Sequence, residues 1–116
     1  MIDSVPRILT GVFPFQGAGY GAPQPLDAAL AYAVPADKRA QMLYLRAGNS
    51  ASEMVCLMMM RDGTPMRMFP IGAKGAVHVP LVVVEDLSPD TKLELRLAAP
   101  EGCAGSVVVD MGLMEV

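Results

Sequence analysis

Residues 53–69 read EMVCLMMMRDGTPMRMF and carry the strongest local structural signal in the chain. Two apolar runs flank Asp62-Gly63, a dipeptide typical of a two-residue β-hairpin turn, in which both turn positions need positive φ. The sequence therefore predicts a hairpin whose two strands are both rich in methionine. Methionine is flexible and polarisable, so it suits irregular cores and adaptable contact surfaces.

In the predicted register, Arg61 pairs with Thr64, so that Met59 faces Met66 and Leu57 faces Met68. Because alternate side chains share a face, one face then carries Val55, Leu57, Met59, Met66 and Met68. The other face carries Met54, Cys56, Met58, Met60, Arg67 and Phe69. Both faces are apolar, whereas an antiparallel hairpin in a small domain normally shows one of them to water.

Three explanations of the second apolar face stay open. The N-terminal arm covers it, another subunit covers it, or the register is different. The arm offers Phe13, Phe15 and Tyr20 for such packing. The predicted interface therefore comprises Met54, Cys56, Met58, Met60, Arg67 and Phe69, together with Phe13, Phe15 and Tyr20.

The rest of the chain predicts one all-β domain. Residues 1–26 form an extended Gly/Pro-rich arm with one possible strand at 7–13, and residues 27–116 form the domain. Residues 26–34 predict a helical turn leading into a strand, and further strands are expected at 40–47, 76–84, 92–97 and 106–116. About seven or eight short strands separated by turn clusters indicate an antiparallel β-sandwich, with jelly-roll wiring as an open option.

Composition narrows the classes of partner. The net charge of −3 and the scattered Lys and Arg residues argue against nucleic acid. No apolar run approaches the length of a membrane helix, and the first residues lack the apolar segment of a signal peptide. We therefore expect a cytoplasmic protein, or one within an assembled particle, whose two cysteines are reduced.

Candidate chemical sites are weak. His78 is the one histidine and has no obvious ligand or base partner nearby, so a structural role is favoured. The glycines of 17–21 lack the context of a phosphate loop, and the acidic loop 85–90 lacks the spacing of a calcium loop. Neither Cys56 nor Cys103 has the neighbours that activate a thiolate. We predict no catalytic residue, metal or cofactor.

These observations favour a non-enzymatic structural or assembly subunit that associates with protein through the hairpin face and the arm. Two alternatives remain. One is a β-sandwich module that binds a small ligand or a carbohydrate, which rests on fold analogy. The other is a copper protein using soft thioether and thiolate ligands from Met54, Cys56, Met58 and Met60.

Overall fold

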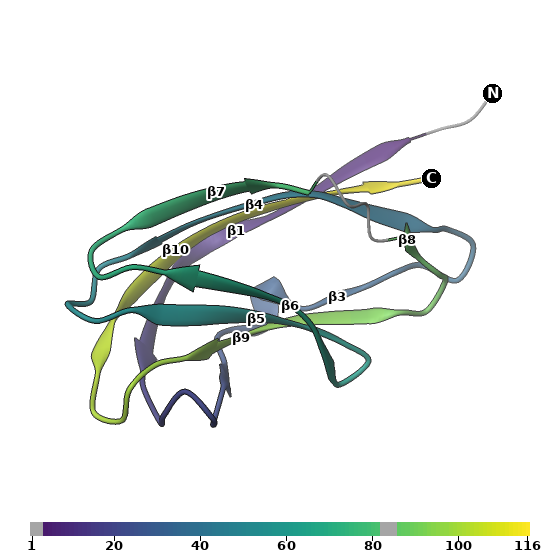
Figure 1. Cartoon of the computed structure of the whole chain (residues 1–116). Helices are drawn as coiled ribbons and strands as arrows, with labels where there is room; N and C mark the ends of the chain where they lie inside the picture. The colour runs from purple at the N-terminus through teal and green to yellow at the C-terminus, as the bar shows by residue number, and fades with distance from the viewer. Residues whose placement is uncertain (1–3, 82–85) are drawn as a thin grey trace.

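The computed structural model describes residues 4–81 and 86–116. Within these ranges the strands form two five-stranded antiparallel sheets that pack face to face. The upper layer in Figure 1 is sheet A, in the order β1-β10-β4-β7, with β8 also paired to β4. The lower layer is sheet B, in the order β2-β9-β5-β6, with β3 also paired to β9. The predicted β-sandwich is confirmed.

The elements follow in chain order, with one short 3₁₀ helix, η1, among the strands. They are β1 (Val5–Gln16), β2 (Gln24–Pro25), η1 (Ala28–Leu30), β3 (Tyr32–Ala33), β4 (Ala40–Asn49), β5 (Val55–Arg61), β6 (Thr64–Ile71), β7 (Ala76–Pro80), β8 (Asp86–Leu87), β9 (Lys92–Ala98) and β10 (Ala104–Glu115). Residues 82–84 of the predicted strand 76–84, and Glu85 of the acidic loop, lie outside the described residues.

The strand order is that of a jelly roll. The first and last strands pair at one side of sheet A, β2 and β3 lie beside β9, and only the β5–β6 hairpin pairs neighbours in sequence within sheet B. Such wiring places successive strands in alternate sheets, so most pairings join distant parts of the chain. The jelly-roll option that the sequence left open is therefore supported by the topology.

The segment predicted as an extended arm is part of the sandwich. β1 pairs with β10 along its whole length, from Val5 opposite Glu115 to Gln16 opposite Ala104. Its alternation sends Phe13 into the core and leaves Ile8 and Val12 on the outer surface. Residues 4–26 thus supply an edge strand of sheet A and one short strand of sheet B.

The hairpin turn matches the prediction, but the register does not. Asp62 and Gly63 both have positive φ, and Arg61 pairs with Thr64. A β-bulge next to Met60 then shifts the pairing, so that Met58, rather than Leu57, lies opposite Met68. A bulge inserts one unpaired residue and so exchanges the faces of everything beyond it.

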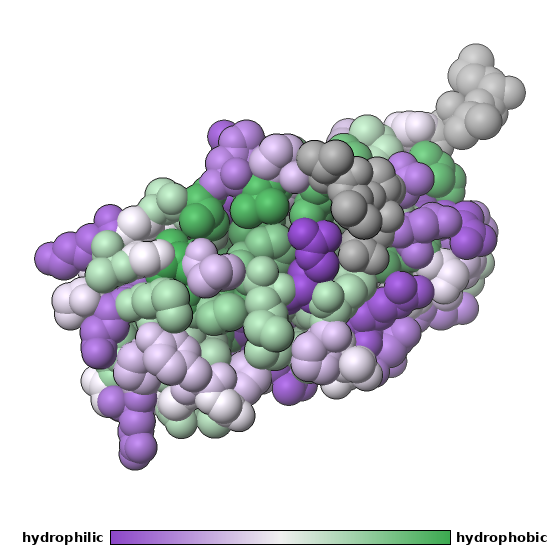
Figure 2. Space-filling model, in the orientation of Figure 1, coloured by the Kyte–Doolittle hydropathy of each residue, from purple (hydrophilic) through white to green (hydrophobic). Residues whose placement is uncertain are grey.

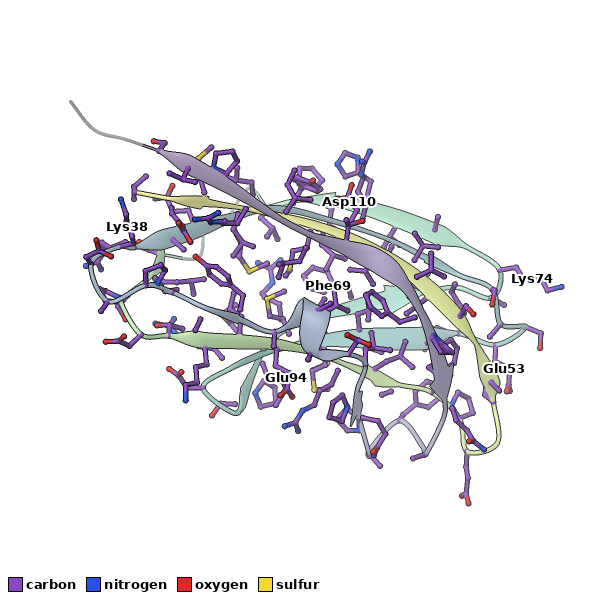
Figure 3. The ribbon with its side chains drawn as sticks, turned by 180° about the vertical axis from the view of Figure 1, so that it is seen from behind. Lys38, Glu53, Phe69, Lys74, Glu94 and Asp110 are labelled. Carbon is purple, nitrogen blue, oxygen red and sulfur yellow. The ribbon has the colours of Figure 1, made fainter. Side chains whose placement is uncertain are left out.

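The bulge brings the hairpin's larger apolar groups into the core. Val55, Leu57, Met59, Phe69 and Ile71 are buried between the sheets, whereas Met68 points outward. Figure 3 shows Phe69 in the space between the two layers. These five side chains lie in one core with Leu93, Leu95 and Leu97 of β9, which alternate with charged residues in the sequence and are buried.

Strands β6 and β7 lie along the same long side of the sandwich, each at the end of the strand order of its sheet. Figure 2 shows apolar side chains along this side, where Met66, Val77 and Val79 pack against the core and stay partly exposed.

The predicted helical turn is present as η1, with Asp27 accepting a hydrogen bond from the backbone N–H of Ala29. Over residues 4–81 and 86–116, no helix has the length and apolarity needed to cross a membrane.

Candidate functional site

The outer face of sheet B carries an exposed methionine cluster. Cys56 and Met58 alternate with buried residues of β5, and Met58 lies opposite Met68 of β6. Met68 is 63% exposed and Met54 is 44% exposed, while Cys56 and Met58 are half-buried. We call Met54, Cys56, Met58 and Met68 the Met face. It presents unbranched sulfur-containing side chains on a rigid sheet, a surface that adapts to the shape of a partner.

The predicted interface residues divide between this face and the core. Phe69 and Phe13 are buried in the core of the same chain, and Phe15 packs against that core. Arg67 lies on the inner side with Met59, and its guanidinium carbon is 5.9 Å from the centre of the Phe69 ring. These four side chains therefore do not share a surface with the Met face.

Tyr20 is the residue of the predicted arm that reaches the methionine cluster. It lies in the loop between β1 and β2, where its hydroxyl donates a hydrogen bond to the backbone carbonyl of Met54 at 2.8 Å. The ring stays substantially exposed. Tyr20 therefore borders the Met face without covering it, and the aromatic cover that the sequence suggested is absent from the described part of the arm.

Met60 occupies a separate position near the tip of the hairpin. It is buried, yet it lies outside the main core cluster. A pocket of about 410 Å³ lies here, lined by Met60, the Asp62-Gly63 turn, residues 31–33 and residues 92–94. Met60 thus belongs to this pocket, while Met54 and Met68 remain accessible on the Met face.

The outer face of sheet A has a different chemistry, which sequence reasoning did not find. Four polar side chains from four strands fall on one line across the sheet. Register pairs Thr10 with Asp110, Asp110 with Arg46, and Arg46 with His78. We call these four residues the polar row. Only the register could have revealed it, because its members come from strands far apart in the sequence.

A hydrogen-bonded ion pair fixes the centre of the polar row. Arg46 donates to Asp110 Oδ2 from Nη2 at 2.6 Å and from Nε at 3.2 Å, while Tyr44 donates its hydroxyl to Oδ1 at 3.0 Å. The hydrogen bonds from Arg46 are the main reason that the pKa of Asp110 is lowered. Burial, followed by the hydrogen bond to Asp110, raises the pKa of Tyr44. Asp110 is therefore ionised near neutral pH.

The aromatic ring beside this ion pair is held by close packing. Gly112 lies opposite Tyr44, and a Cβ atom at Gly112 would be 2.2 Å from the tyrosine ring. The absent side chain lets the ring lie against β10 with its hydroxyl at Asp110. On the other side, the rings of Tyr44 and His78 meet edge to face, with centroids 6.3 Å apart.

An open groove of about 640 Å³ runs beside the polar row. Thr10, Asp110, Arg46 and His78 line one side, and Val108, Gly48 and Ala76 supply an apolar side with small residues. Figure 3 shows Asp110 on the outer side of sheet A. Its volume lies within the range of small-molecule sites, but the groove is open to solvent and not enclosed.

The cysteines are poor candidates for nucleophiles. Burial raises the pKa of both the Cys56 and Cys103 thiols, and nearby Glu53 adds to the effect at Cys103. Among the residues that the structure describes, no three His, Cys, Asp or Glu side chains gather in a way that could hold a metal ion.

Comparisons with known proteins find similarity at the level of the fold. No protein-family model and no curated protein matches the sequence. The CBM36-1 domain of a multidomain xylanase, from the hindgut metagenome of Trinervitermes trinervoides, superposes with a TM-score of 0.61 at 14% identity, covering 95% of this chain and 96% of that one. A chain of infectious bursal disease virus, Gt strain, superposes with a TM-score of 0.51 at 15% identity. That match covers 97% of this chain and 32% of the viral one, so this chain spans about a third of its length.

Proposed function

We propose that this protein is a non-enzymatic assembly subunit that associates with copies of itself through the Met face. The observation that carries the proposal is the exposure of Met68 and Met54 around half-buried Met58 and Cys56, on a sheet whose other face fills the core. Contiguous exposed apolar patches often mark sites of protein–protein contact. Methionine is also enriched in interfaces relative to other surfaces.

The physical driving force is removal of these side chains from water. Burial of apolar surface contributes about 25 cal/mol per Å², from which the entropy of association is subtracted. The nearby Arg96–Glu94 ion pair lies on the same outer face and is a candidate for the polar rim. The jelly-roll fold supports an assembly role by analogy, since one of the similar structures is a chain of infectious bursal disease virus.

The decisive measurement is the solution molar mass as a function of concentration, by light scattering and sedimentation. Met68→Glu and Met58→Glu each place a charge in the proposed contact and should lower the molar mass by removing this contact. Thr64→Glu, on an exposed position of the same strand β6, is the matched control and should leave the mass unchanged. A molar mass that neither methionine variant lowers, or a wild type that is monomeric at every concentration, would refute this role.

The second candidate function is carbohydrate binding, and the groove beside the polar row favours it. Sugar hydroxyls both donate and accept hydrogen bonds, so they match a line of Arg, Asp, Thr and His side chains. The apolar side, formed by Val108 and Ala76, suits the C–H face of a sugar ring. The similar fold of a carbohydrate-binding module adds support by analogy.

Calorimetric titration with soluble xylan and other glycans tests this alternative. Arg46→Ala and His78→Ala should each weaken any binding at the groove, while Met68→Glu, on the opposite sheet, should not. Binding that responds to Met68→Glu instead, or no binding to any glycan, would remove the alternative. The two functions are therefore separated by variants on opposite faces of the sandwich.

A further inference from the structure

We propose that β1 is a second contact site, where another copy of this chain adds its own β1 as an antiparallel strand. The two strands are related by a two-fold axis at Thr10. The inference rests on the proposed function in taking the chain as an assembling subunit, but it concerns a different surface. Within the described residues β1 pairs only with β10, which leaves its other edge open. Figure 3 shows β1 running along the near side of the sandwich.

The backbone of β1 shows which amides are available on that open edge. Just beyond the strand, the N–H of Gly17 donates to the carbonyl of Cys103 at 2.6 Å, in continuation of the β1–β10 register. Hydrogen-bonding direction alternates along a strand, so odd-numbered residues of β1 face β10 and even-numbered residues face outward. Pro6 and Pro14 are both even-numbered, so their missing N–H groups remove no hydrogen bond between β1 and β10.

The other sheet edges carry features that discourage strand addition. β7 is short and ends at Pro80. β6 contains Pro70 and, beside a bulge, Pro65. The remaining edge consists of the two-residue strands β2 and β3, separated by η1. Proline, bulges and short strands are the usual protections of exposed edges. β1 differs, because residues 7–13 form a long uninterrupted stretch without proline.

The sequence of β1 is complementary to itself in one register. With Thr10 on the two-fold axis, Thr10 pairs with Thr10 of the other copy, and Ile8 pairs with Val12. Each of these pairs exchanges two backbone hydrogen bonds, since all three residues keep an outward N–H. Moving the register by two residues in either direction sets Pro6 or Pro14 against one of them and loses a donor. The two prolines thus limit the contact to residues 8–12.

The outward side chains fit the same register. Ile8 is 61% exposed and Val12 is 65% exposed in the single chain, although both are large and apolar. In the proposed dimer each Ile8 lies beside a Val12 of the other copy, and such cross-strand apolar pairs stabilise a sheet. The positive charge of Arg7 lies opposite Phe13 rather than another arginine. The partner that best fits the open edge of β1 is therefore the β1 strand of a second copy.

Thr10→Pro is the sharpest test of the edge. Its N–H faces outward, so proline there spares the ladder to β10, as Pro6 and Pro14 do, while it blocks the centre of the new pairing. Thr10→Ala keeps the N–H and is the matched control. We expect Thr10→Pro to raise the dissociation constant of this contact at least about tenfold, with an unchanged circular dichroism spectrum, and Thr10→Ala to leave association intact.

A pair of charge variants tests the register and the identity of the partner. Ile8→Lys alone and Val12→Glu alone each place a charge against an apolar residue and should weaken association. The double variant Ile8→Lys with Val12→Glu sets opposite charges together twice across the two-fold axis and should restore it. Restoration is expected only if the partner is another copy in this register.

The results separate this proposal from the function it rests on. Loss of the contact in Thr10→Pro, with restoration in the double charge variant, supports β1 pairing. Self-association that Met68→Glu abolishes and Thr10→Pro does not change would overturn β1 pairing and leave the assembly role standing. Failure of the double charge variant to restore association would overturn the second copy as occupant, and a strictly monomeric wild type would overturn both proposals.

Discussion

The Tyr32 hydroxyl donates a hydrogen bond to the carboxylate of Glu115, and this contact ties sheet B to sheet A. Glu115 is almost fully buried, and it also forms an ion pair with Arg7 of β1, with 3.2 Å between Arg7 Nε and Glu115 Oε1. A buried carboxylate is tolerated where hydrogen bonds and an opposite charge compensate its lost hydration. One side chain therefore links β1, β3 and β10.

Acid should weaken the fold through Glu115. The hydrogen bond from Tyr32 is the largest cause lowering the pKa of Glu115 below its ordinary value of 4.5, and Arg7 adds to it. A lowered carboxyl pKa contributes stability that is present above pH 4.5 and lost as pH falls through the folded-state value. We expect the urea midpoint of the wild type to fall over this acid range.

Glu115→Gln should remove part of that pH dependence. At neutral pH the variant should be less stable by about 1–3 kcal/mol, because a hydrogen-bonded charged group is lost. Its urea midpoint should then change less between pH 6 and pH 3 than that of the wild type, a range set by ordinary carboxyl pKa values of about 4. Glu101→Gln, in an exposed turn, is the control. Equal pH dependence in wild type and Glu115→Gln would exclude this carboxylate as the cause.

Gly112→Ala should be destabilising because of Tyr44. The added methyl group would meet the tyrosine ring at 2.2 Å, and overpacking of this kind costs about 1–3 kcal/mol. A double-mutant cycle with Tyr44→Ala, followed by urea unfolding, measures the conflict. Most of the cost of Gly112→Ala should vanish in the Tyr44→Ala background. An unchanged cost there would point to a backbone effect at Gly112 instead.

Neighbouring methionines of the hairpin should respond very differently to truncation. Met59 is fully buried, so Met59→Ala should lower the free energy of unfolding by about 2–5 kcal/mol. Met68→Ala should change it by no more than about 0.5 kcal/mol, because Met68 is largely exposed. Chemical denaturation of monomeric protein checks both values. A large loss in Met68→Ala would show that the bulged register is wrong.

Both thiols should react slowly with iodoacetamide near neutral pH. Burial raises the pKa of Cys56 and of Cys103, which lowers the fraction of reactive thiolate. The alkylation rates of Cys56→Ser and Cys103→Ser, each with one thiol left, should both be below that of free cysteine and should rise with pH. A rate above that of free cysteine at either position would reveal an activated thiol.

The features predicted correctly from the sequence are local. The Asp62-Gly63 turn follows from the need for positive φ, and the alternation Leu93, Leu95, Leu97 in β9 predicts its buried face. The short helical turn before β3 is marked by Asp27 as its cap. Each of these signals lies within a few residues of the structure it specifies.

The errors arose where the deciding partner is distant or where both choices look alike. Methionines 58, 59, 66 and 68 can lie on either the inner or the outer face of the sheet, so they do not indicate the register. The burial of Phe69 is what reveals the bulge. The segment of β1 resembles an arm because its partner, β10, is at the other end of the sequence. The polar row could not be predicted for the same reason, since Asp110 and His78 lie beside Arg46 only because of the sheet register.

The pairing of β1 with β10 also sets the order in which the molecule can be completed. During synthesis β1 leaves the ribosome before the other described strands of the sandwich, and its hydrogen-bonding partner β10 leaves after them. In the finished sheet β10 also separates β1 from β4. Until β10 emerges, the apolar side chains of β1 lack their permanent neighbour. Such high contact order slows folding and exposes unpaired strands to chaperones and to other nascent chains. Sheet A is therefore expected to form late, after the local β5–β6 hairpin.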